Sequence, residues 1–436
     1  MKNIIRPVKG TRDFYPEQMA MRTWLYDTVR RVSESFGYQE YEAPILESLN
    51  LYAAKSGEEL VKKQAYVFTD RGGDEITLRP ELTPSLARMI AQKQGELAFP
   101  ARWWSFGPFW RYEKMQKGRS REFFQWNIDM LGVDSPEADA ELVAIAADLL
   151  KAVGLAPGQA RIYVNNRRLM DAAFDALGFS PEAKGVVSGL VDRRGKMEPV
   201  AWDALAMESG LTPARLAGLK GLLADTEAWR RSEELVRLFS ALEALGVADY
   251  VQFDPNIMRG LLYYTGTVFE AFDITGSVRR AILGGGRYDN LLADVGGETL
   301  SGVGFAMGDV VLSVVLSELG LMPEELRANP ASVLVTVFSP QLQAASLKLA
   351  SDLRESGLNV TCYPEPVKLP KQFKFADRMG MRVVLVLGPD EVAQAKVAVK
   401  NLGDGTQEVV DRGELLASVK RVLGAPEIRR GPHLSS

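Results

Sequence analysis

The chain of 436 residues contains a single cysteine and a single histidine. Cys362 therefore has no partner for an intramolecular disulfide, and zinc sites built from cysteine and histidine ligands are excluded. His433, near the C-terminal end, leaves no basis for Ser–His triads, Cys–His pairs or histidine metal sites. We expect no metal site made by the protein alone, and acid–base steps would have to use carboxylates, lysine, tyrosine or the substrate.

The chain also lacks a large excess of charge and any apolar run long enough to cross a membrane. Its net charge is -4, so contacts with nucleic acid would have to be local. The N-terminal segment contains no apolar signal core, and we expect a soluble, cytoplasmic protein. Hydrophobic residues make up 46% and charged residues 25%, which is an ordinary globular composition, and the length predicts two or three domains.

The stretch from Phe106 to Gly132 carries the strongest local signal. An apolar run, Phe106–Trp110, predicts a buried strand, and a return strand is predicted after a loop that contains Lys114, Lys117, Arg119 and Arg121. A cationic loop on two strands can bind a nucleoside triphosphate, because arginine grips phosphate oxygens with two donors. A solvated basic turn would have the same sequence pattern, so this stretch alone leaves both interpretations open.

Arg111 and Glu113 directly follow the apolar run, and strand periodicity predicts that both point to one face. A guanidinium beside a buried strand needs a partner, since an unpaired buried charge is costly. Either Glu113 or a ligand could be that partner.

A second acidic position precedes a predicted helix. Tyr66–Thr69 and Glu75–Leu78 alternate as two strands, and Thr83 followed by proline predicts a helix start with Thr83 as its N-cap. Glu81 could bind an amine, but the local pattern favours a capping acid stabilised by the helix dipole.

Glycines gather at 284–286, 302, 304 and 308, which predicts that a flat ligand or another backbone approaches closely there. Earlier in the chain, a predicted strand over 38–46 contains Pro44, which indicates an edge that is either covered within the monomer or part of a dimer surface. Near the end, Lys371 and Lys374 share one face of a predicted helix, as expected for either a solvated face or a site for RNA phosphates.

Together these segments resemble histidyl-tRNA synthetases, a family of class II aminoacyl-tRNA synthetases. The matching strings are GTRDFYP at 10–16, LRPELT at 78–83, FWRYEKMQKGRSREFFQ at 109–125, RGLLYYTGTVFE at 259–270 and GGGRYDNL at 284–291. The resemblance runs nearly end to end, and the RGLLYYTGTVFE string is the most specific to the family.

The resemblance implies an α/β protein whose α+β catalytic domain, residues 1–325, contains an antiparallel sheet flanked by helices and a helical insertion at about 167–246. A C-terminal α/β anticodon-binding domain with a largely parallel sheet is expected over 331–424, and a disordered tail over 425–436. The family also implies a homodimer.

The resemblance further implies roles for individual residues. Arg111 and Arg259 would be catalytic, and ATP, which would enter with Mg²⁺, would be bound by Arg111, Glu113, Arg119 and Phe123. Histidine would be bound by Glu81, Thr83, Gln125, Asp129, Arg259, Tyr263, Tyr264 and Tyr288. The tRNA would be contacted by Gln116, Lys371 and Lys374.

Two positions depart from the family pattern. Leu262 stands where many members have an acid, and Val311 stands where the arginine for the γ-phosphate is usual, in the string Gly-Asp-Val-Val-Leu at 308–312. Asp309 could contribute there only through Mg²⁺. The implied activity is the activation of histidine with ATP and its transfer to tRNA(His). One alternative is a histidine-sensing regulatory subunit of ATP phosphoribosyltransferase, which the missing arginine favours and the complete loop and C-terminal domain disfavour. A sensor of uncharged tRNA is a further alternative, although no effector domain is visible.

Overall fold

The computed structural model describes residues 4–53, 63–116, 118–258, 263–290, 293–323, 326 and 328–424. Arg259, Leu262 and the predicted tail over 425–436 therefore lie outside the described residues. The chain divides into two compact units, one formed by Met1–Asp13 and Thr23–Glu324 and the other by Phe14–Arg22 and Glu325–Ser436. None of the described helices is long and apolar enough to cross a membrane.

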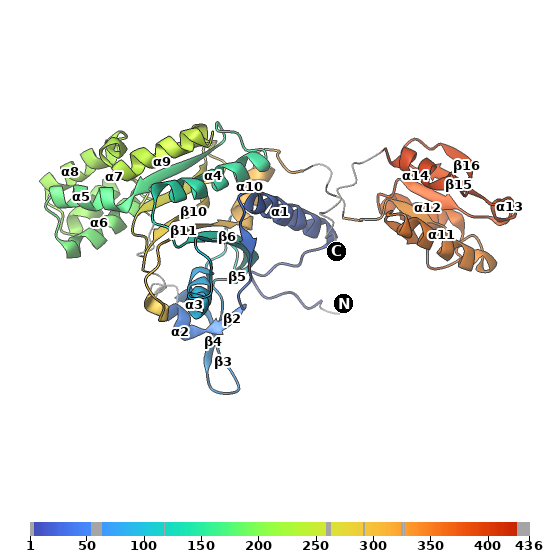
Figure 1. The fold of residues 1–436 in the computed structure, drawn as a ribbon, viewed down its shortest axis with the longest axis horizontal. Helices are drawn as coiled ribbons and strands as arrows, with labels where there is room; N and C mark the ends of the chain where they lie inside the picture. Colours follow the sequence, from blue (N-terminus) through green and yellow to red (C-terminus); the bar gives the residue numbers. More distant parts are fainter. Residues whose placement is uncertain are drawn as a thin grey trace. The chain divides into compact units, whose positions relative to one another are not determined.

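An eight-stranded sheet forms the centre of the first unit (Figure 1). Its order is β1 (Gln39–Glu40), β5 (Ala101–Trp110), β6 (Glu122–Leu131), β11 (Gly302–Gly308), β10 (Ala281–Tyr288), β9 (Thr267–Asp273), β7 (Ala160–Asn166) and β8 (Val251–Phe253). Neighbours are antiparallel from β5 to β7, and the edge strands β1 and β8 run parallel to β5 and β7. The predicted fold class is thereby confirmed.

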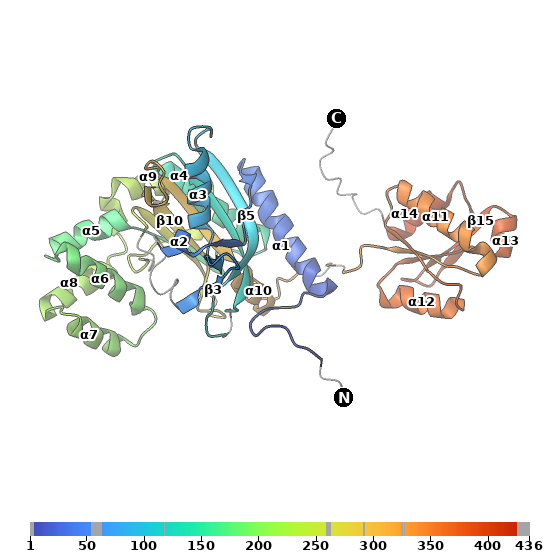
Figure 2. The same ribbon diagram turned by 90° about the horizontal axis from the view of Figure 1, so that it is seen from below.

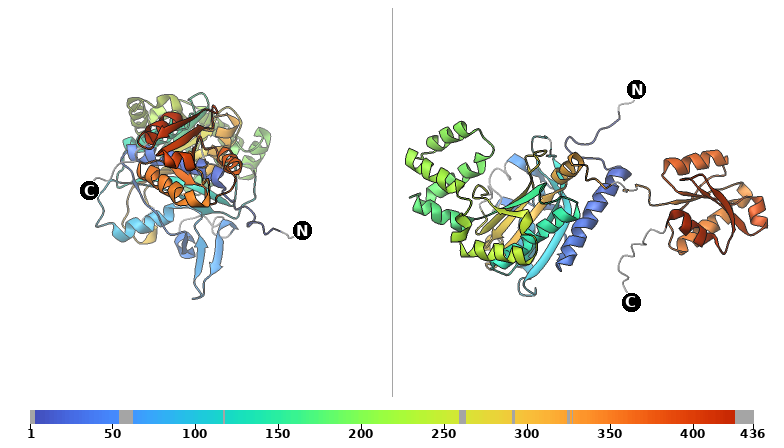
Figure 3. Two further views of the ribbon diagram at one scale, coloured as in Figure 1. Left: turned by 90° about the vertical axis from the view of Figure 1, so that its right-hand side faces the viewer. Right: turned by 90° about the horizontal axis from the view of Figure 1, so that it is seen from above.

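The strand predicted over 38–46 is much shorter than expected. Only Gln39 and Glu40 pair with β5, and the chain leaves this sheet before Pro44, which has no N–H to donate to a ladder. Residues Leu46–Ser48 form β2 in a separate three-stranded sheet with β4 (Glu75–Leu78) and β3 (Tyr66–Thr69). The β3–β4 hairpin matches its predicted bounds and projects from the first unit (Figure 3).

Helices cover one face of the large sheet. Helix α4 (Pro136–Ala152) packs across β6, β7, β9, β10 and β11, because its alanine, leucine and isoleucine side chains are buried along almost the whole helix. Helix α1 (Pro16–Ser35) is joined to β6 where the Trp126 indole donates to the Ser33 hydroxyl at 3.1 Å. Helix α10 (Asp309–Glu318) packs against β6, β10 and β11. Alternate residues of β6 therefore face these helices, and the remaining ones face the opposite side.

Between β7 and β8 the chain is helical. The helices are α5 (Arg167–Ala176), α6 (Pro181–Arg194), α7 (Pro199–Glu208), α8 (Pro213–Ala224) and α9 (Glu233–Ala244). The first four share a hydrophobic core that contains Phe174, Leu190, Trp202 and Leu219, whereas α9 packs against α4. Figure 2 shows α5 to α8 gathered together beside the sheet.

The second unit contains a five-stranded sheet. Its order is β13 (Val360–Cys362), β12 (Val333–Val335), β14 (Val383–Val386), β15 (Lys396–Asn401) and β16 (Gln407–Asp411). The three predicted strands are parallel as expected, but β15 and β16 were not predicted and run antiparallel. Helices α11 (Gln343–Glu355) and α14 (Leu415–Leu423) pack on one face and α12 (Leu369–Arg378) on the other (Figure 2). The remaining short helices are α2 (Leu49–Ala53), α3 (Thr83–Lys93) and α13 (Pro389–Ala393).

A buried glutamine attaches α12 to the end of β12. The Gln372 side chain is fully buried, accepts a hydrogen bond from Val337 N at 2.9 Å and donates to the carbonyls of Val337 and Val367 at 2.8 and 2.7 Å. Its neighbours Lys371 and Lys374 are exposed on the other side of the helix. Packing thus fixes which face of α12 meets solvent.

We expect Gln372→Met to destabilise the second unit by about 3 kcal/mol, because it leaves buried backbone groups without partners. Amide hydrogen exchange of residues 332–424 should then show protection reduced by roughly 100-fold. Lys371→Met, the same replacement on the exposed side, should change protection by less than about threefold. Equal protection in both variants would contradict this assignment.

Candidate active site

A cavity of about 980 Å³ lies on the side of the sheet that faces away from Trp126. Alternate residues of five strands line it, and residues two apart share a face of a strand. They are Phe123 and Gln125 of β6, Ala306 and Gly308 of β11, Ile282 and Gly284 of β10, Glu270 and Phe272 of β9, and Tyr163 of β7. The sheet therefore forms one continuous wall of the cavity.

The β5–β6 loop, residues 111–121, forms a second wall. Strand β5 ends at Trp110, so Arg111 and Glu113 lie in this loop and not in a strand as predicted. Both still line the cavity. Arg111 Nε donates to the carbonyl of Pro80 at 2.9 Å, and its guanidinium lies 5.4 Å from the centre of the Phe123 ring. The partner that Arg111 requires is therefore a backbone carbonyl.

Glu113 pairs with Arg119 instead. The Arg119 Nε to Glu113 Oε2 distance is 2.5 Å, and the Glu113 side chain is only 9% exposed. Phe123 stacks on Phe109 with ring centres 6.0 Å apart, which gives the cavity a rigid aromatic wall next to Arg111. The loop thus places two cations and an aromatic face together, as the sequence predicted.

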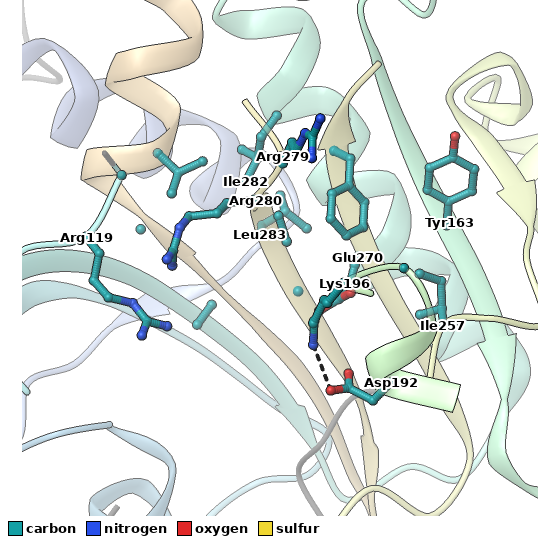
Figure 4. Close-up of a pocket in the computed structure, with 18 of the residues that line it drawn as sticks. Arg119, Tyr163, Asp192, Lys196, Ile257, Glu270, Arg279, Arg280, Ile282 and Leu283 are labelled. Atoms are coloured by element: carbon teal, nitrogen blue, oxygen red, sulfur yellow. Dashed lines mark hydrogen bonds and ion pairs between the residues drawn. The ribbon is translucent and has the colours of Figure 1, made fainter. Parts of the chain in front are cut away.

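Two groups of cavity residues were missed by sequence reasoning. Arg279 and Arg280 directly precede β10, where the paired arginines before the glycine string were an available signal. The other group comes from the end of α6, where Lys196 donates to Asp192 at 2.7 Å (Figure 4). No sequence pattern indicated that the helical insertion would reach the cavity.

Asp129 and Tyr288 form a buried pair beyond Gln125 on the same face of β6. The Tyr288 hydroxyl donates to Asp129 Oδ1 at 2.6 Å. Burial raises the pKa of Asp129 to about 7, and the hydrogen bond from Tyr288 opposes that rise only in part. The ring of Tyr263 lies 4.7 Å from that of Tyr264 and 6.4 Å from that of Tyr288, so the predicted tyrosines do come together.

Glycines make room for these side chains. A Cβ atom on Gly304 would lie 2.0 Å from Asp129 Oδ1, and one on Gly302 would lie 2.6 Å from the Tyr288 ring. The predicted close approach of another backbone occurs at Gly285, where a Cβ atom would lie 2.1 Å from the Gly304 carbonyl oxygen. At the other two positions the approaching groups are protein side chains, which the sequence did not predict.

Asn127 lies between Gln125 and Asp129 on this face and was also missed. It is 5% exposed, and its Nδ2 group finds no hydrogen-bond partner within the part of the chain that the structure describes. The buried hydroxyl of Tyr41 is in the same state. Both groups are available donors at this end of the sheet.

The predicted amino-group ligands occupy a different position. Helix α3 begins at Thr83 itself, with Leu82 at the N-cap and no side-chain cap, so the prediction of Thr83 as N-cap is wrong. The Glu81 carbonyl accepts a hydrogen bond from Tyr52 at 3.3 Å. Among the described residues, neither Glu81 nor Thr83 lines the cavity, and the same holds for Asp129 and the three tyrosines.

Asp309 is engaged elsewhere. Its carboxylate binds the Arg12 guanidinium at 2.8 Å and accepts a hydrogen bond from Phe124 N at 2.8 Å. Burial raises the pKa of Asp309, although Arg12 opposes the shift. The side chain therefore joins the N-terminal segment to β6 and α10, and the suggested role through Mg²⁺ is not supported. The predicted tRNA contacts Gln116, Lys371 and Lys374 are all exposed, the first in the β5–β6 loop and the others on α12.

Comparison with known proteins agrees with these features. Residues 10–309 match the family model for histidyl-tRNA synthetase, and residues 332–422 match the model for an anticodon binding domain. The chain belongs to the histidyl-tRNA synthetase family. This family member is 36% identical over 431 residues to the histidine–tRNA ligase of Leptospira biflexa, a match that covers 95% of this chain and 97% of the relative.

Two further relatives support the assignment. The chloroplastic/mitochondrial histidine–tRNA ligase of Arabidopsis thaliana is 37% identical over 424 residues, which covers 94% of this synthetase-family chain and 86% of the relative. The crystal structure of histidyl-tRNA synthetase from Nostoc sp. PCC 7120 superposes with a TM-score of 0.82 at 28% identity, covering 96% of this chain and 100% of that one. The resemblance drawn from the sequence motifs is thereby confirmed.

The Asp129 carboxyl gives the synthetase-family fold a specific dependence on pH. Between about pH 4 and pH 7 the folded protein holds a proton on Asp129 that the unfolded chain has lost, so this group lowers the stability as pH rises through that range. We expect the unfolding free energy of the wild type to fall by about 3 kcal/mol relative to Asp129→Asn between pH 5 and pH 8.

Urea unfolding followed by tryptophan fluorescence measures this difference, since every tryptophan lies within residues 24–229. Asp27→Asn, at an exposed aspartate of α1, should follow the wild-type pH dependence. Parallel curves for the wild type and Asp129→Asn would show that Asp129 is ionised throughout.

Proposed function

We propose that the protein activates L-histidine with ATP to form histidyl-adenylate and then transfers histidine to the 3′ end of tRNA(His). The observation that carries this proposal is the arrangement along β6. Phe123 and Gln125 line the cavity beside the cationic loop, and Asp129 lies farther along the same face within the tyrosine cluster. One strand therefore presents a nucleotide-binding end and an amino-acid-binding end.

The proposed first step needs no protein nucleophile. An oxygen of the histidine carboxylate attacks the α-phosphorus of ATP, the bond from that phosphorus to the bridging oxygen breaks, and pyrophosphate leaves. Arg111 neutralises the charge that develops at the α-phosphate, and Arg259 lies between the two anionic reactants. In the second step a ribose hydroxyl of the tRNA attacks the acyl carbon and AMP leaves.

The binding roles follow from the same residues. Glu113 contacts the adenine side of ATP and Phe123 stacks on the ring, while Arg119 holds the outer phosphates. Glu81 and Thr83 bind the amino group of histidine, and Gln125, Asp129, Tyr263, Tyr264 and Tyr288 surround the amino group and the imidazole. A pocket whose buried polar groups match both imidazole nitrogens rejects other amino acids, since unmatched groups are costly.

ATP is proposed to enter with Mg²⁺. The carboxylates of Glu113 and Glu270 line the cavity and provide the oxygen ligands that this ion prefers. The ion supplies positive charge against the phosphates when bound. Residues 1–325 are proposed as the catalytic domain, with the helical insertion at about 167–246, and residues 331–424 as the anticodon-binding domain.

A homodimer is also proposed. The apolar side chains of Ile45, Leu46, Val67 and Phe68 are 40–52% exposed on the three-stranded sheet and its approach, which suits contact with a second copy. The cytoplasmic location remains a prediction of the sequence.

The second candidate is a histidine-sensing regulatory subunit of ATP phosphoribosyltransferase. Val311 in place of an arginine is the observation that favours it. The match of residues 332–422 to an anticodon binding domain and the complete β5–β6 loop favour the ligase.

ATP–pyrophosphate exchange with each amino acid tests the proposal. We expect exchange that depends on histidine, and a reduction of roughly 1000-fold in Arg259→Ala with histidine binding, measured by calorimetry, retained. Absence of exchange in the wild type at saturating Mg²⁺-ATP would instead support the regulatory subunit. Unchanged exchange in Arg259→Ala would show that this arginine is not catalytic.

The exposed face of α12 yields a separate expectation for tRNA. Replacing Lys371 and Lys374 by alanine should raise the KM for tRNA roughly 10-fold and lower its salt dependence by one to two phosphate contacts' worth, about 0.7–0.9 log units each. Exchange without tRNA should stay unchanged. A matched double replacement of Lys348 and Lys420, exposed on α11 and α14, should leave charging unchanged. Equal effects of the two pairs would mean that α12 holds no RNA.

A further inference from the structure

We propose that Arg280, directly before β10, binds the outer phosphates of ATP in place of the arginine that α10 lacks at Val311. This inference rests on the proposed function and assigns a residue that the family resemblance does not. It identifies a cation from a different element of the fold as the functional substitute.

Val311 marks where charge is missing. It occupies the place of the usual arginine in the first turn of α10 and lines the cavity, but its side chain can offer only methyl groups to a phosphate. Asp309, in the same turn, is held by Arg12 and the backbone of Phe124. The start of α10 therefore supplies no cationic side chain to the cavity.

Arg280 passes directly beside this position. A Cβ atom placed on Gly118 of the β5–β6 loop would lie 3.3 Å from Arg280 Cδ and 3.5 Å from Val311 Cγ2. Both side chains thus meet at one point below the loop, and the guanidinium of Arg280 extends beyond it. Figure 4 shows Arg280 and Arg119 extending into the same part of the cavity from different elements.

The charge of Arg280 is poorly compensated by the protein. Within the described ranges no carboxylate forms an ion pair with it, because the nearby Glu113 is already paired with Arg119 at 2.5 Å. Burial, and then the adjacent charge of Arg119, lower the pKa of Arg280, while Glu113 offsets part of this effect. Two neighbouring guanidinium groups around one carboxylate favour a bound polyanion.

The location selects the outer phosphates over the α-phosphate. Arg111 is held on the Pro80 carbonyl beside Phe123, at the aromatic wall proposed for the adenine. Arg280 lies beside Val311 and Arg119, the two positions that the resemblance relates to the outer phosphates. Arg280 is therefore placed to stabilise pyrophosphate as it leaves.

The test uses histidine-dependent ATP–pyrophosphate exchange of the full chain. We expect Arg280→Ala to lower kcat/KM for ATP about 100-fold and to raise the KM for pyrophosphate, since one charge-assisted donor is lost. Inhibition by AMP, which lacks the outer phosphates, and the KM for histidine should change by less than about threefold. Arg280→Lys, which keeps the charge, should recover part of the loss.

A relocated arginine separates this role from a structural one. The double variant Arg280→Ala with Val311→Arg supplies a guanidinium from α10 and should regain at least about 10-fold of the lost kcat/KM. Arg237→Ala removes the same charge from α9, outside the cavity, and should leave exchange unchanged.

Three results would overturn the inference: unchanged exchange in Arg280→Ala, a loss of AMP binding as large as that of ATP, or the expected loss appearing in Arg279→Ala instead. These results are distinct from failure of the proposed function, in which the wild type itself shows no exchange with histidine.

Discussion

The amino-acid end of the site depends on the absence of side chains where β11 meets β6 and β10. With Cβ atoms at Gly304 and Gly302, Asp129 and Tyr288 could not lie over the strand surface as they do. The buried pair that they form is then possible, and its low-dielectric surroundings account for the raised pKa of Asp129. Backbone geometry that only glycine permits thus sets the electrostatics of the pocket.

The nucleotide end follows the opposite rule, because it concentrates side chains of one charge. Arg111 is anchored by a carbonyl and Arg119 by Glu113, while Arg280 is left with little compensation. An arrangement of fixed cations costs stability in the empty protein and lowers the energy of the bound triphosphate, so little reorganisation is needed when charge develops.

Local patterns predicted the local structure well. The hairpin strands Tyr66–Thr69 and Glu75–Leu78 have their predicted bounds, since alternation and a turn rich in glycine and aspartate determine them. The strand before the cationic loop and its return strand were also recognised, and the loop lies at the cavity as expected. The cap at Thr83 failed because Leu82 takes the position before the helix, a choice of backbone geometry that propensities do not resolve.

Contacts distant in sequence were beyond the reach of such patterns. Arg12 binds Asp309 across nearly 300 positions, and this pairing removed a candidate phosphate ligand from the site. The residues of α6 that line the cavity belong to a segment without any recognisable motif. Asn127 was hidden between two predicted ligands, since only the assembled sheet reveals that its amide is buried and lacks a partner among the described residues.

The parallel pairing of β7 and β8 has a consequence for how this fold can vary. The chain leaves the sheet after Asn166 and returns at Val251 on the adjacent strand, so both ends of the helical segment are fixed side by side. A segment attached in this way can be lengthened, shortened or exchanged in evolution without altering the register of the other strands. Because the end of α6 also lines the cavity, such changes would reshape one wall of the site while leaving the catalytic strands untouched.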